Sequence, residues 1–422
     1  MADPCQSIFQ SVSRTGQSVR VGRRTYDLSR FDQVFAVGAG KASARMAQAL
    51  ERLLGSRLKG GLVVVKTGHR VPTKRIRVIE AAHPIPDTIG LQAAEQLRAL
   101  IQRLTSRDLL FVLLSGGASS LLPAPVPSVT LADTQRTTRL LLRGGATIHE
   151  MNAVRKHLSL LKGGGLAAST KATIVTLILS DVIGDDLSTI GSGPTAPDST
   201  TFADAIGTLR KYSLWPAVPE AIRRHLLEGR RGRIPETLKA GSPRLRHVQH
   251  QIVGNNSGML RAVVHAAKSA GLRTILYPTA LVGEAREAAH RFVSFARPYT
   301  MGKKKLLRPI CIVAGGEPTV TVTGQGKGGR AQEFAAAAAL DLDGLPNAWL
   351  AAVGTDGTDG PTEMAGAAVS GKTLAQAKAR GVNLRSALQH HDTYSAFKAM
   401  GCHIHTGPTG TNVNDLYLLL LL

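Results

Sequence analysis

The sequence predicts an α/β fold built around parallel strands, and two features of the chain carry this prediction. Short runs of β-branched and aliphatic residues repeatedly lead into a glycine-rich or polar loop, which then leads into an amphipathic stretch. The runs are continuously apolar and lack strict alternation, which is typical of strands buried on both faces of a parallel sheet. The length of 422 residues is enough for two domains, or three.

Four strand-to-loop passages succeed one another in the N-terminal part of the chain. The predicted strands cover residues 34–37, 109–114, 173–179 and 251–253, and the loops cover residues 38–43, 115–120, 180–186 and 254–257. After the first and the fourth loop, apolar residues recur at helical spacing until a glycine, Gly55 or Gly271, ends the predicted helix. This pattern indicates helices packed on a sheet.

The domain boundary is predicted from a change in composition. Between Trp215 and Val248 the alternation of strands and helices breaks, and prolines and arginines accumulate. We therefore predict one domain over residues 1–245 and a second, smaller one over residues 246–422. In the second domain, residues 310–313 begin a new set of strands, residues 319–323 alternate like a strand with one solvated face, and the leucine-rich residues 416–422 form a buried strand or helix end.

Composition excludes several classes of protein. With 43% hydrophobic and 19% charged residues, the chain lies far from the composition of disordered proteins. The three cysteines, Cys5, Cys311 and Cys402, are too few for a disulfide framework and show no zinc-binding spacing. No apolar run approaches the ~18–20 residues of a membrane span, and the N-terminus does not resemble a signal peptide. We therefore expect a soluble, cytoplasmic protein without a membrane partner.

The charge of the chain favours anionic small molecules as ligands. Lys+Arg 52 against Asp+Glu 29 gives a formal charge of +23 at pH 7. Such an excess also occurs in nucleic-acid-binding proteins, but the basic clusters at residues 230–233 and 303–305 have no aromatic residues between them for base stacking. We therefore expect no nucleic-acid partner and a solvated basic surface that attracts anions.

The first loop combines small residues with a cation at the start of a predicted helix. Gly38 and Gly40 would let backbone N–H groups approach an anion, the helix dipole favours negative charge there, and Lys41 adds a point charge. The loop is not a Walker A motif, because Ala42 follows the lysine. It approximates the dinucleotide fingerprint G-x-G-x-x-G/A, which keeps an NADP-dependent reductase open, and a tight turn with a solvated lysine is the plain alternative.

Two further segments could hold an anion. A second cradle of small residues and hydroxyls follows the strand 109–114, namely Ser115, Gly116, Gly117 and Ser119. Residues 152–162 are predicted as one helix in which Arg155, Ser159 and Lys162 share a face. That basic face could hold a carboxylate or a phosphate, although Lys162 could equally interact with the helix C-terminus.

Acidic and glycine-rich loops complete the candidate set, and all of them follow predicted strands, where ligands of parallel sheets bind. Asp181, Asp185 and Asp186 could hold a Mg²⁺–nucleotide complex, because Mg²⁺ takes one or two protein carboxylates. Glu317 follows the strand 310–313, the segment 324–330 contains four glycines and two cations, and residues 355–361 form an acidic turn. Each is more often an ordinary turn than a site, so only their joint occurrence at strand ends favours a site.

Taken in order, these motifs resemble those of the class II glycerate kinases. The motifs are GAGKAS at Gly38, LLSGGASSLL at Leu113, NAVRKHLS at Asn152, LSDVIGDD at Leu179, GSGPTAPD at Gly191, GGEPTVTV at Gly315, GGRAQE at Gly328, GTDGTDGPT at Gly354 and GTNVNDL at Gly410. The series spans the chain from about Phe31 to the C-terminus. The resemblance implies a Rossmann-like N-terminal domain with a parallel sheet, followed by a C-terminal α/β domain of the MOFRL type.

The resemblance also implies an activity. Members of this family transfer the γ-phosphoryl group of ATP, with Mg²⁺, to the 2-hydroxyl of D-glycerate, which gives 2-phosphoglycerate and ADP. An NADP-dependent hydroxypyruvate reductase is the alternative. The partners implied are therefore the small molecules ATP and D-glycerate, and a homo-oligomer remains open.

The site residues follow from the resemblance and from the loops above. Those expected to be catalytic are Lys41, Arg330 and Asp356. Those expected to bind substrate or nucleotide are Gly38, Gly40, Ser115, Gly116, Gly117, Ser119, Arg155, Asn255, Glu317 and Asn412. The expected metal ligands are Asp181 and Asp185.

Overall fold

The computed structural model describes residues 3–300, 309–345 and 347–422 and divides the chain into two compact units, residues 3–253 and residues 254–422. The boundary predicted between residues 245 and 246 lies before this division, because strand β9 (Val248–Gly254) still joins the N-terminal sheet. The basic cluster expected at residues 303–305 lies outside the described residues. No helix in the described part of the chain combines the length and apolar character of a membrane span.

The N-terminal unit is built on a six-stranded sheet with the order β6-β5-β4-β7-β8-β9. The strands are β4 (Val34–Ala39), β5 (Leu58–Lys66), β6 (Ile76–Ala81), β7 (Leu109–Leu114), β8 (Thr173–Leu179) and β9. All pairs from β6 to β8 are parallel, and every residue of β7 is buried, as the continuous apolar runs predicted. Because β5 and β6 lie on one side of β4 and β7 on the other, the strand order reverses at β4, and ligands of such sheets bind outside the strand ends at this point.

Helices and a small second sheet surround this sheet. Next to the sheet lie α1 (Pro4–Ser11), α2 (Ser43–Leu54), α3 (Thr88–Gln102), α4 (Ala118–Leu121) and α7 (Gly165–Ala168), together with the antiparallel strands β1 (Val12–Thr15), β2 (Ser18–Val21) and β3 (Arg24–Asp27). Short 3₁₀ turns cover Leu28–Arg30, Gly55–Arg57, Ile190–Ser192 and Pro243–Leu245. The helices predicted after the first and fourth loops are confirmed as α2 and α10 (Asn256–Ser269).

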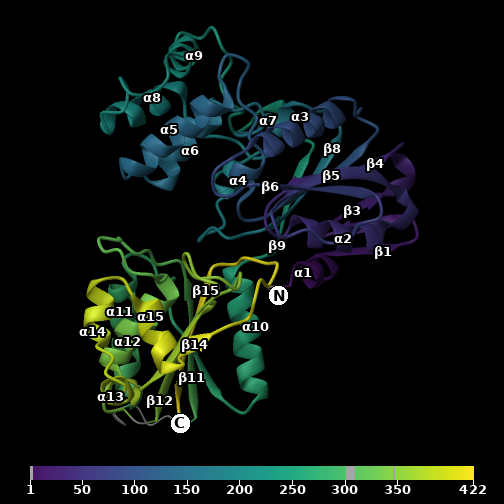
Figure 1. Ribbon diagram of the computed structural model, residues 1–422. Helices are drawn as coiled ribbons and strands as arrows, with labels where there is room; N and C mark the ends of the chain where they lie inside the picture. The colour runs from purple at the N-terminus through teal and green to yellow at the C-terminus, as the bar shows by residue number, and fades with distance from the viewer. Residues whose placement is uncertain (1–2, 301–308, 346) are drawn as a thin grey trace. The chain divides into compact units, whose positions relative to one another are not determined.

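A separate group of helices carries its own apolar core. It consists of α5 (Leu131–Arg143), α6 (Ile148–His157), α8 (Phe202–Lys211) and α9 (Glu220–Arg230), which lie together in Figure 1. Their core contains Leu141, Val154, Phe202 and Leu226. The prediction of one helix over residues 152–162 is wrong at its end, because α6 stops at His157 and the chain then pairs with the segment 124–126, where the N–H of Val126 donates to the carbonyl of Leu158.

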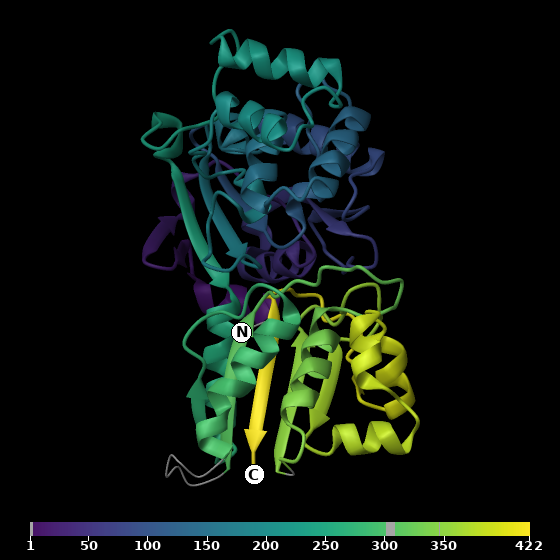
Figure 2. The same cartoon turned by 90° about the vertical axis from the view of Figure 1, so that its left-hand side faces the viewer.

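The C-terminal unit contains a mixed sheet with the order β10-β11-β15-β12-β13-β14. The strands are β10 (Arg273–Leu276), β11 (Ile310–Gly316), β12 (Ala348–Gly354), β13 (Gly366–Ser370), β14 (His403–Ile404) and β15 (Asp415–Leu421). The leucine-rich end of the chain is confirmed as a strand, and β15 runs antiparallel between β11 and β12, in yellow at the centre of the sheet in Figure 2. Alternate residues of β15 are buried, so the run of leucines has one face in the core.

Helices cover both faces of this sheet: α10 lies on one side and the group α11 to α15 on the other (Figure 1). That group comprises α11 (Ala285–Thr300), α12 (Arg330–Asp341), α13 (Thr373–Ala379), α14 (Leu384–Gln389) and α15 (Thr393–Met400). The prediction of a strand over residues 319–323 is wrong. Thr319 forms one bridge with Glu284, and the next residues find no neighbouring strand to continue the ladder.

Candidate functional site

The loops after β4 and β7 meet at the point where the strand order of the N-terminal sheet reverses, and they are hydrogen-bonded to each other. The N–H of Lys41 donates to the carbonyl of Gly116 (2.8 Å), and the N–H of Ala42 donates to Oγ of Ser115 (3.0 Å). The N–H of Gly40 donates to the carbonyl of Val64 on β5 (3.0 Å). An anion at the first loop would therefore be bound by the Lys41 side chain and not by these amides, which differs from the cradle that the sequence predicted.

Gly38 and Gly40 allow this close approach of the two loops. A Cβ at Gly38 would lie 2.1 Å from the carbonyl oxygen of Leu113, and one at Gly40 would lie 2.2 Å from Oγ of Ser115. Gly40 also has a φ of +133°, a conformation that favours glycine. Both glycines are thus explained by packing, Gly38 between the paired strands β4 and β7 and Gly40 between the two loops, whatever ligand the loops bind.

The second loop keeps backbone donors available. Gly117 has a φ of +89° and precedes α4, and within the described residues the N–H groups of Gly116 and Gly117 donate to no protein acceptor. His83 lies against this loop, since a Cβ at Gly117 would come within 2.9 Å of its ring. The loop therefore offers free amides beside an imidazole at the end of a central strand.

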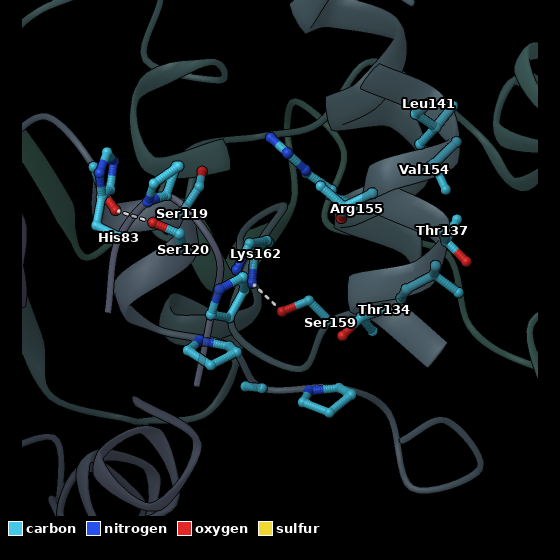
Figure 3. A pocket seen from close by; sticks show the side chains of 18 residues that line it. His83, Ser119, Ser120, Thr134, Thr137, Leu141, Val154, Arg155, Ser159 and Lys162 are labelled. Atoms are coloured by element: carbon cyan, nitrogen blue, oxygen red, sulfur yellow. Dashed lines mark hydrogen bonds between the residues drawn. The ribbon is translucent and has the colours of Figure 1, made fainter. Parts of the chain in front are cut away.

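A pocket of about 190 Å³ opens next to the second loop, entirely within the N-terminal unit (Figure 3). Arg155 and Lys162 supply two cations, and no carboxylate is among the residues that line the pocket. Hydroxyl groups supply most of its other polar lining, from Ser119, Ser120, Thr134, Thr137, Thr138 and Ser159. Positive charge without a protein counter-ion, surrounded by hydroxyls, suits a small polar anion.

Lys162 is the more deeply placed of the two cations. Its side chain is 7% exposed, and its Nζ donates to the carbonyl of Leu122 (3.1 Å). Burial, with a contribution from the charge of Arg155, lowers the pKa of Lys162 to about 7. Lys162 is therefore close to its point of half-protonation at neutral pH, and an anion in the pocket would favour its charged form.

Arg155 projects from α6 into the space between α6 and the turn that carries Ser119 and Ser120 (Figure 3). Burial lowers the pKa of Arg155, but its guanidinium stays charged at any physiological pH. Among the described residues its guanidinium donates to no protein acceptor. The five N–H donors of Arg155 are therefore available to a ligand.

Thr137 adds an unsatisfied polar group to the pocket wall. Its residue is 2% exposed, and its Oγ1 has no hydrogen-bond partner. A buried hydroxyl without a partner costs free energy unless a ligand or water supplies one. Because the oxygen itself is out of contact with solvent, this hydroxyl does not by itself identify the pocket as a binding site.

The three carboxylates of the acidic loop after β8 have different surroundings. Asp186 accepts hydrogen bonds from Ser188 and Thr189, and these outweigh the effect of burial and lower its pKa. Asp181 and Asp185 lie half-buried in the same loop, and Asp185 has a φ of 57°. Two carboxylates in one loop fit the oxygen ligands that Mg²⁺ takes from a protein, with the remaining positions left to water and phosphate. Among the described residues no set of three His, Cys, Asp or Glu side chains could hold a metal ion.

The C-terminal unit places Arg330 between two carboxylates. Its Nε and Nη2 donate to Asp415 (2.7 and 3.1 Å), and its Nη1 donates to Glu317 (2.9 Å). The Asp415 side chain is 2% exposed, and burial, opposed by Arg330, raises its pKa to about 7. The guanidinium of Arg330, which the resemblance implied to be catalytic, therefore makes a bidentate pair with Asp415 within the protein.

Three other predicted residues are held in turns or helix caps. Asp356 accepts from the N–H and the Oγ1 of Thr358, both at 3.0 Å. Asn255 caps α10 by accepting from the N–H of Gly258 (2.8 Å), and Asn412 accepts from the N–H of Asn414 (3.1 Å). Asn414 in turn donates to Glu317 (2.9 Å), so the turn that carries Asn412 adjoins the Arg330 cluster.

The structure thus forms two groups from the predicted residues, one in each unit. Gly117, Ser119 and Arg155 line the pocket, with Gly38, Gly40, Ser115 and Gly116 in the loops beside it; Glu317 and Arg330 form the second group. The sequence left Lys162 open between an anion contact and the helix C-terminus, and it did not assign His83, Thr137 or Asp415 to the site. Lys162 had a signal in its shared face with Arg155, and Asp415 had one in its place within the last motif.

Comparison with known proteins identifies the family. Residues 1–227 match a domain described as a domain of unknown function (DUF4147), and residues 310–415 match the MOFRL family. The glycerate 2-kinase of Pyrococcus horikoshii is 39% identical over 421 residues, which cover 100% of this chain and 94% of the relative. A protein of Agrobacterium vitis, provisionally named a hydroxypyruvate reductase, is 43% identical over 388 residues, which cover 91% of this chain and 86% of the relative.

Solved structures agree with the sequence relatives. The crystal structure of glycerate kinase from Thermotoga maritima matches with a TM-score of 0.86 and 37% identity, and covers 99% of this chain and 95% of that one. The matched glycerate kinases cover nearly the whole of this chain, which places it in the class of small-molecule kinases. The chain belongs to the glycerate 2-kinase family with a MOFRL domain, and it is an enzyme of the kinase class.

Proposed function

We propose that this enzyme transfers the γ-phosphoryl group of ATP to the 2-hydroxyl of D-glycerate, giving 2-phosphoglycerate and ADP, with Mg²⁺ as cofactor. The observation that carries the proposal is the pocket of the N-terminal unit, in which Arg155 and Lys162 are two cations without a protein counter-ion. The names of the relatives, glycerate 2-kinase and glycerate kinase, agree with a small hydroxy acid as the acceptor.

The pocket matches D-glycerate in size and in chemistry. A volume of about 190 Å³ corresponds to about six water molecules at liquid density, which is room for a three-carbon acid. The carboxylate would bind the Arg155 fork through two parallel hydrogen bonds and the Lys162 ammonium by charge. The two substrate hydroxyls would exchange hydrogen bonds with the serine and threonine hydroxyls of the wall.

The phosphate-binding side is assigned to the end of β4 and β7. Lys41 would neutralise charge on the β- and γ-phosphates, and the free amides of Gly116 and Gly117 would add donors. Asp181 and Asp185 would hold Mg²⁺, which when bound to ATP neutralises part of the phosphate charge. Phosphoryl transfer needs mainly positioning and charge neutralisation, and these groups supply both.

We also propose catalytic roles for two residues of the C-terminal unit. Asp356, whose carboxylate accepts from Thr358 within its turn, would orient the reacting hydroxyl or accept its proton, as the family motif at Gly354 implies. Arg330 uses three of its five N–H donors on Asp415 and Glu317. Its remaining two donors could bind a phosphate, while its ion pairs fix the start of α12.

The reductase alternative has a structural argument against it. A dinucleotide would need its pyrophosphate close to the backbone of Gly38 and Gly40, and this space is occupied by Leu113 of β7 and by Ser115 of the second loop. The deciding experiment compares ADP release with D-glycerate and ATP against NADPH oxidation with hydroxypyruvate. We expect only the first, with NMR of the product locating the phosphate on the 2-oxygen; NADPH oxidation without ADP release would overturn the proposal.

A further inference from the structure

Three side chains from three different segments form a buried row that ends at the pocket. Asn152 of α6 is 2% exposed and accepts a hydrogen bond at its Oδ1 from Oγ of Ser192 (3.0 Å). Ser192, fully buried in the turn Ile190–Ser192, lies 2.6 Å from Oγ of Ser119. Ser119 is half-buried and lines the pocket, where Figure 3 shows it on the side toward which Arg155 extends.

The row has a direction, which follows from counting protons. A serine hydroxyl has one proton and two lone pairs. The proton of Ser192 is donated to Asn152, so Ser192 can only accept from Ser119. The proton of Ser119 is then used within the protein, and its oxygen presents lone pairs alone to the pocket. A pocket ligand that meets Ser119 must therefore donate a hydrogen bond to it.

The conformation of Ser192 is unusual and is imposed by its surroundings. Gly191, Ser192 and Gly193 all have φ values near +60° (58°, 61° and 61°), and Ser192 is the one among them with a side chain. The N–H groups of Gly163 and Gly164 hold this turn by donating to the carbonyls of Ser192 and Gly193 (3.0 and 2.7 Å). Glycine would adopt this conformation more easily, so the serine side chain is retained at an energetic cost, as is common at functional positions.

The polarity of the row complements the other polar groups of the pocket. Arg155 and Lys162 only donate hydrogen bonds and would take the carboxylate of a ligand. An acceptor at Ser119 suits the hydroxyl proton of the same molecule. A ligand that meets both requirements is a hydroxy acid. An acid that lacks the hydroxyl would leave the acceptor at Ser119 without a partner and would bind more weakly.

We propose that Asn152 and Ser192 are positioning residues that orient Ser119 as the acceptor for one hydroxyl of the substrate, so that the pocket selects hydroxy acids against their deoxy analogues. This inference rests on the proposed function, in which the pocket binds D-glycerate. It assigns to Ser119 the discrimination between ligands and to Arg155 and Lys162 the general affinity for carboxylates.

The test measures inhibition constants or dissociation constants for D-glycerate and for its two deoxy analogues, lactate and 3-hydroxypropanoate. In the wild type, at least one analogue should bind tenfold or more weakly than D-glycerate, because a buried acceptor is left without a partner. In Ser119→Ala and in Ser192→Gly, all three acids should bind within about threefold of one another. Ser192→Gly is the informative variant, because glycine keeps the left-handed backbone and removes only the hydroxyl.

Two further variants separate positioning from a structural role. Asn152→Asp keeps an oxygen acceptor for Ser192 and should retain the wild-type discrimination, whereas a folded Asn152→Asp protein that lost it would contradict the direction of the row. Ser169→Ala removes a half-buried hydroxyl outside the pocket lining, which donates to the carbonyl of Gly165 (2.7 Å), and should leave the ratio between ligands as in the wild type.

The outcomes distinguish this inference from the proposed function. If Ser119→Ala or Ser192→Gly discriminates between the three acids as the wild type does, the row is not the source of selectivity. This result would not contradict the proposed kinase function. A wild-type protein that binds none of the three acids would instead remove the proposed substrate.

Discussion

Replacing Lys162 by methionine should weaken D-glycerate binding and stabilise the folded protein at the same time. Lys162 is 7% exposed, and burial together with the charge of Arg155 lowers its pKa from 10.5 to about 7. The unfolded chain therefore keeps this proton between pH 7 and about 10.5, while the folded protein loses it. Because the unfolded state binds more protons in this window, the contribution of Lys162 to the free energy of unfolding rises with pH across it.

The magnitudes follow from the same pKa. A difference of about 3.5 pH units at ~1.4 kcal/mol each means that the buried lysine costs on the order of 4 kcal/mol of stability at pH 7. Lys162→Met, which keeps the apolar stem and removes the amine, should recover part of this and raise the midpoint of thermal unfolding. In the wild type, affinity for D-glycerate should fall about tenfold for each pH unit above 7. Only the protonated, charged form of Lys162 binds the carboxylate, and its fraction falls about tenfold per pH unit above the pKa.

The assay is a pH series from 6 to 9 of thermal unfolding and of kcat/KM for D-glycerate. Lys162→Met should show lower kcat/KM at pH 6.5 and lose the decline above pH 7 that this group causes. Lys171, which is exposed and does not line the pocket, supplies the control variant Lys171→Met, with wild-type pH dependence. A Lys162→Met protein that is less stable than the wild type and keeps its affinity would refute both the assigned pKa and the assigned role.

Four further predictions test the proposed machinery. Lys41→Ala should lower kcat about a hundredfold or more with unchanged unfolding, because the charge on the phosphates loses its partner; near-native kcat would remove Lys41 from the mechanism. Arg330→Lys should lose most activity and also stability in thermal unfolding, because a lysine cannot reproduce the bidentate pairing that compensates buried Asp415; wild-type kinetics would exclude any role for the fork. Asp356→Asn should lower kcat by ~10²–10⁴ while the turn survives, and a loss of stability in proportion to activity would indicate that the residue only caps the turn. Asp181→Asn should raise the Mg²⁺ concentration needed for half-maximal activity, and full activity in excess chelator would show that the carboxylate has no metal to hold.

Some of the candidate residues could be predicted from the sequence, whereas their partners in the folded protein could not. Residues of the second loop and Arg155 were identified because small residues, hydroxyls and cations follow strand ends, and the structure brings Gly117, Ser119 and Arg155 together at one pocket. The partners of Arg330 could not be predicted in this way. Asp415 lies 85 positions away in the sequence and meets Arg330 through the position of β15 beside β11.

What the sequence determined by itself is local. Continuous apolar runs specify buried strands, glycines at strand ends specify tight passages into helices, and the leucines of residues 416–422 specify a buried element, because each depends on burial and backbone freedom within a few residues. The structure then shows that this last element is a strand. Only the tertiary structure decided which polar groups are free. The amides at Gly40 and Lys41 are consumed by neighbouring strands and loops, whereas Lys162 is buried beside Arg155 without a carboxylate, and both outcomes depend on contacts between distant segments. Burial and hydrogen bonding set the charge and the availability of a group, and these are properties of the folded surroundings that residue type and spacing do not contain.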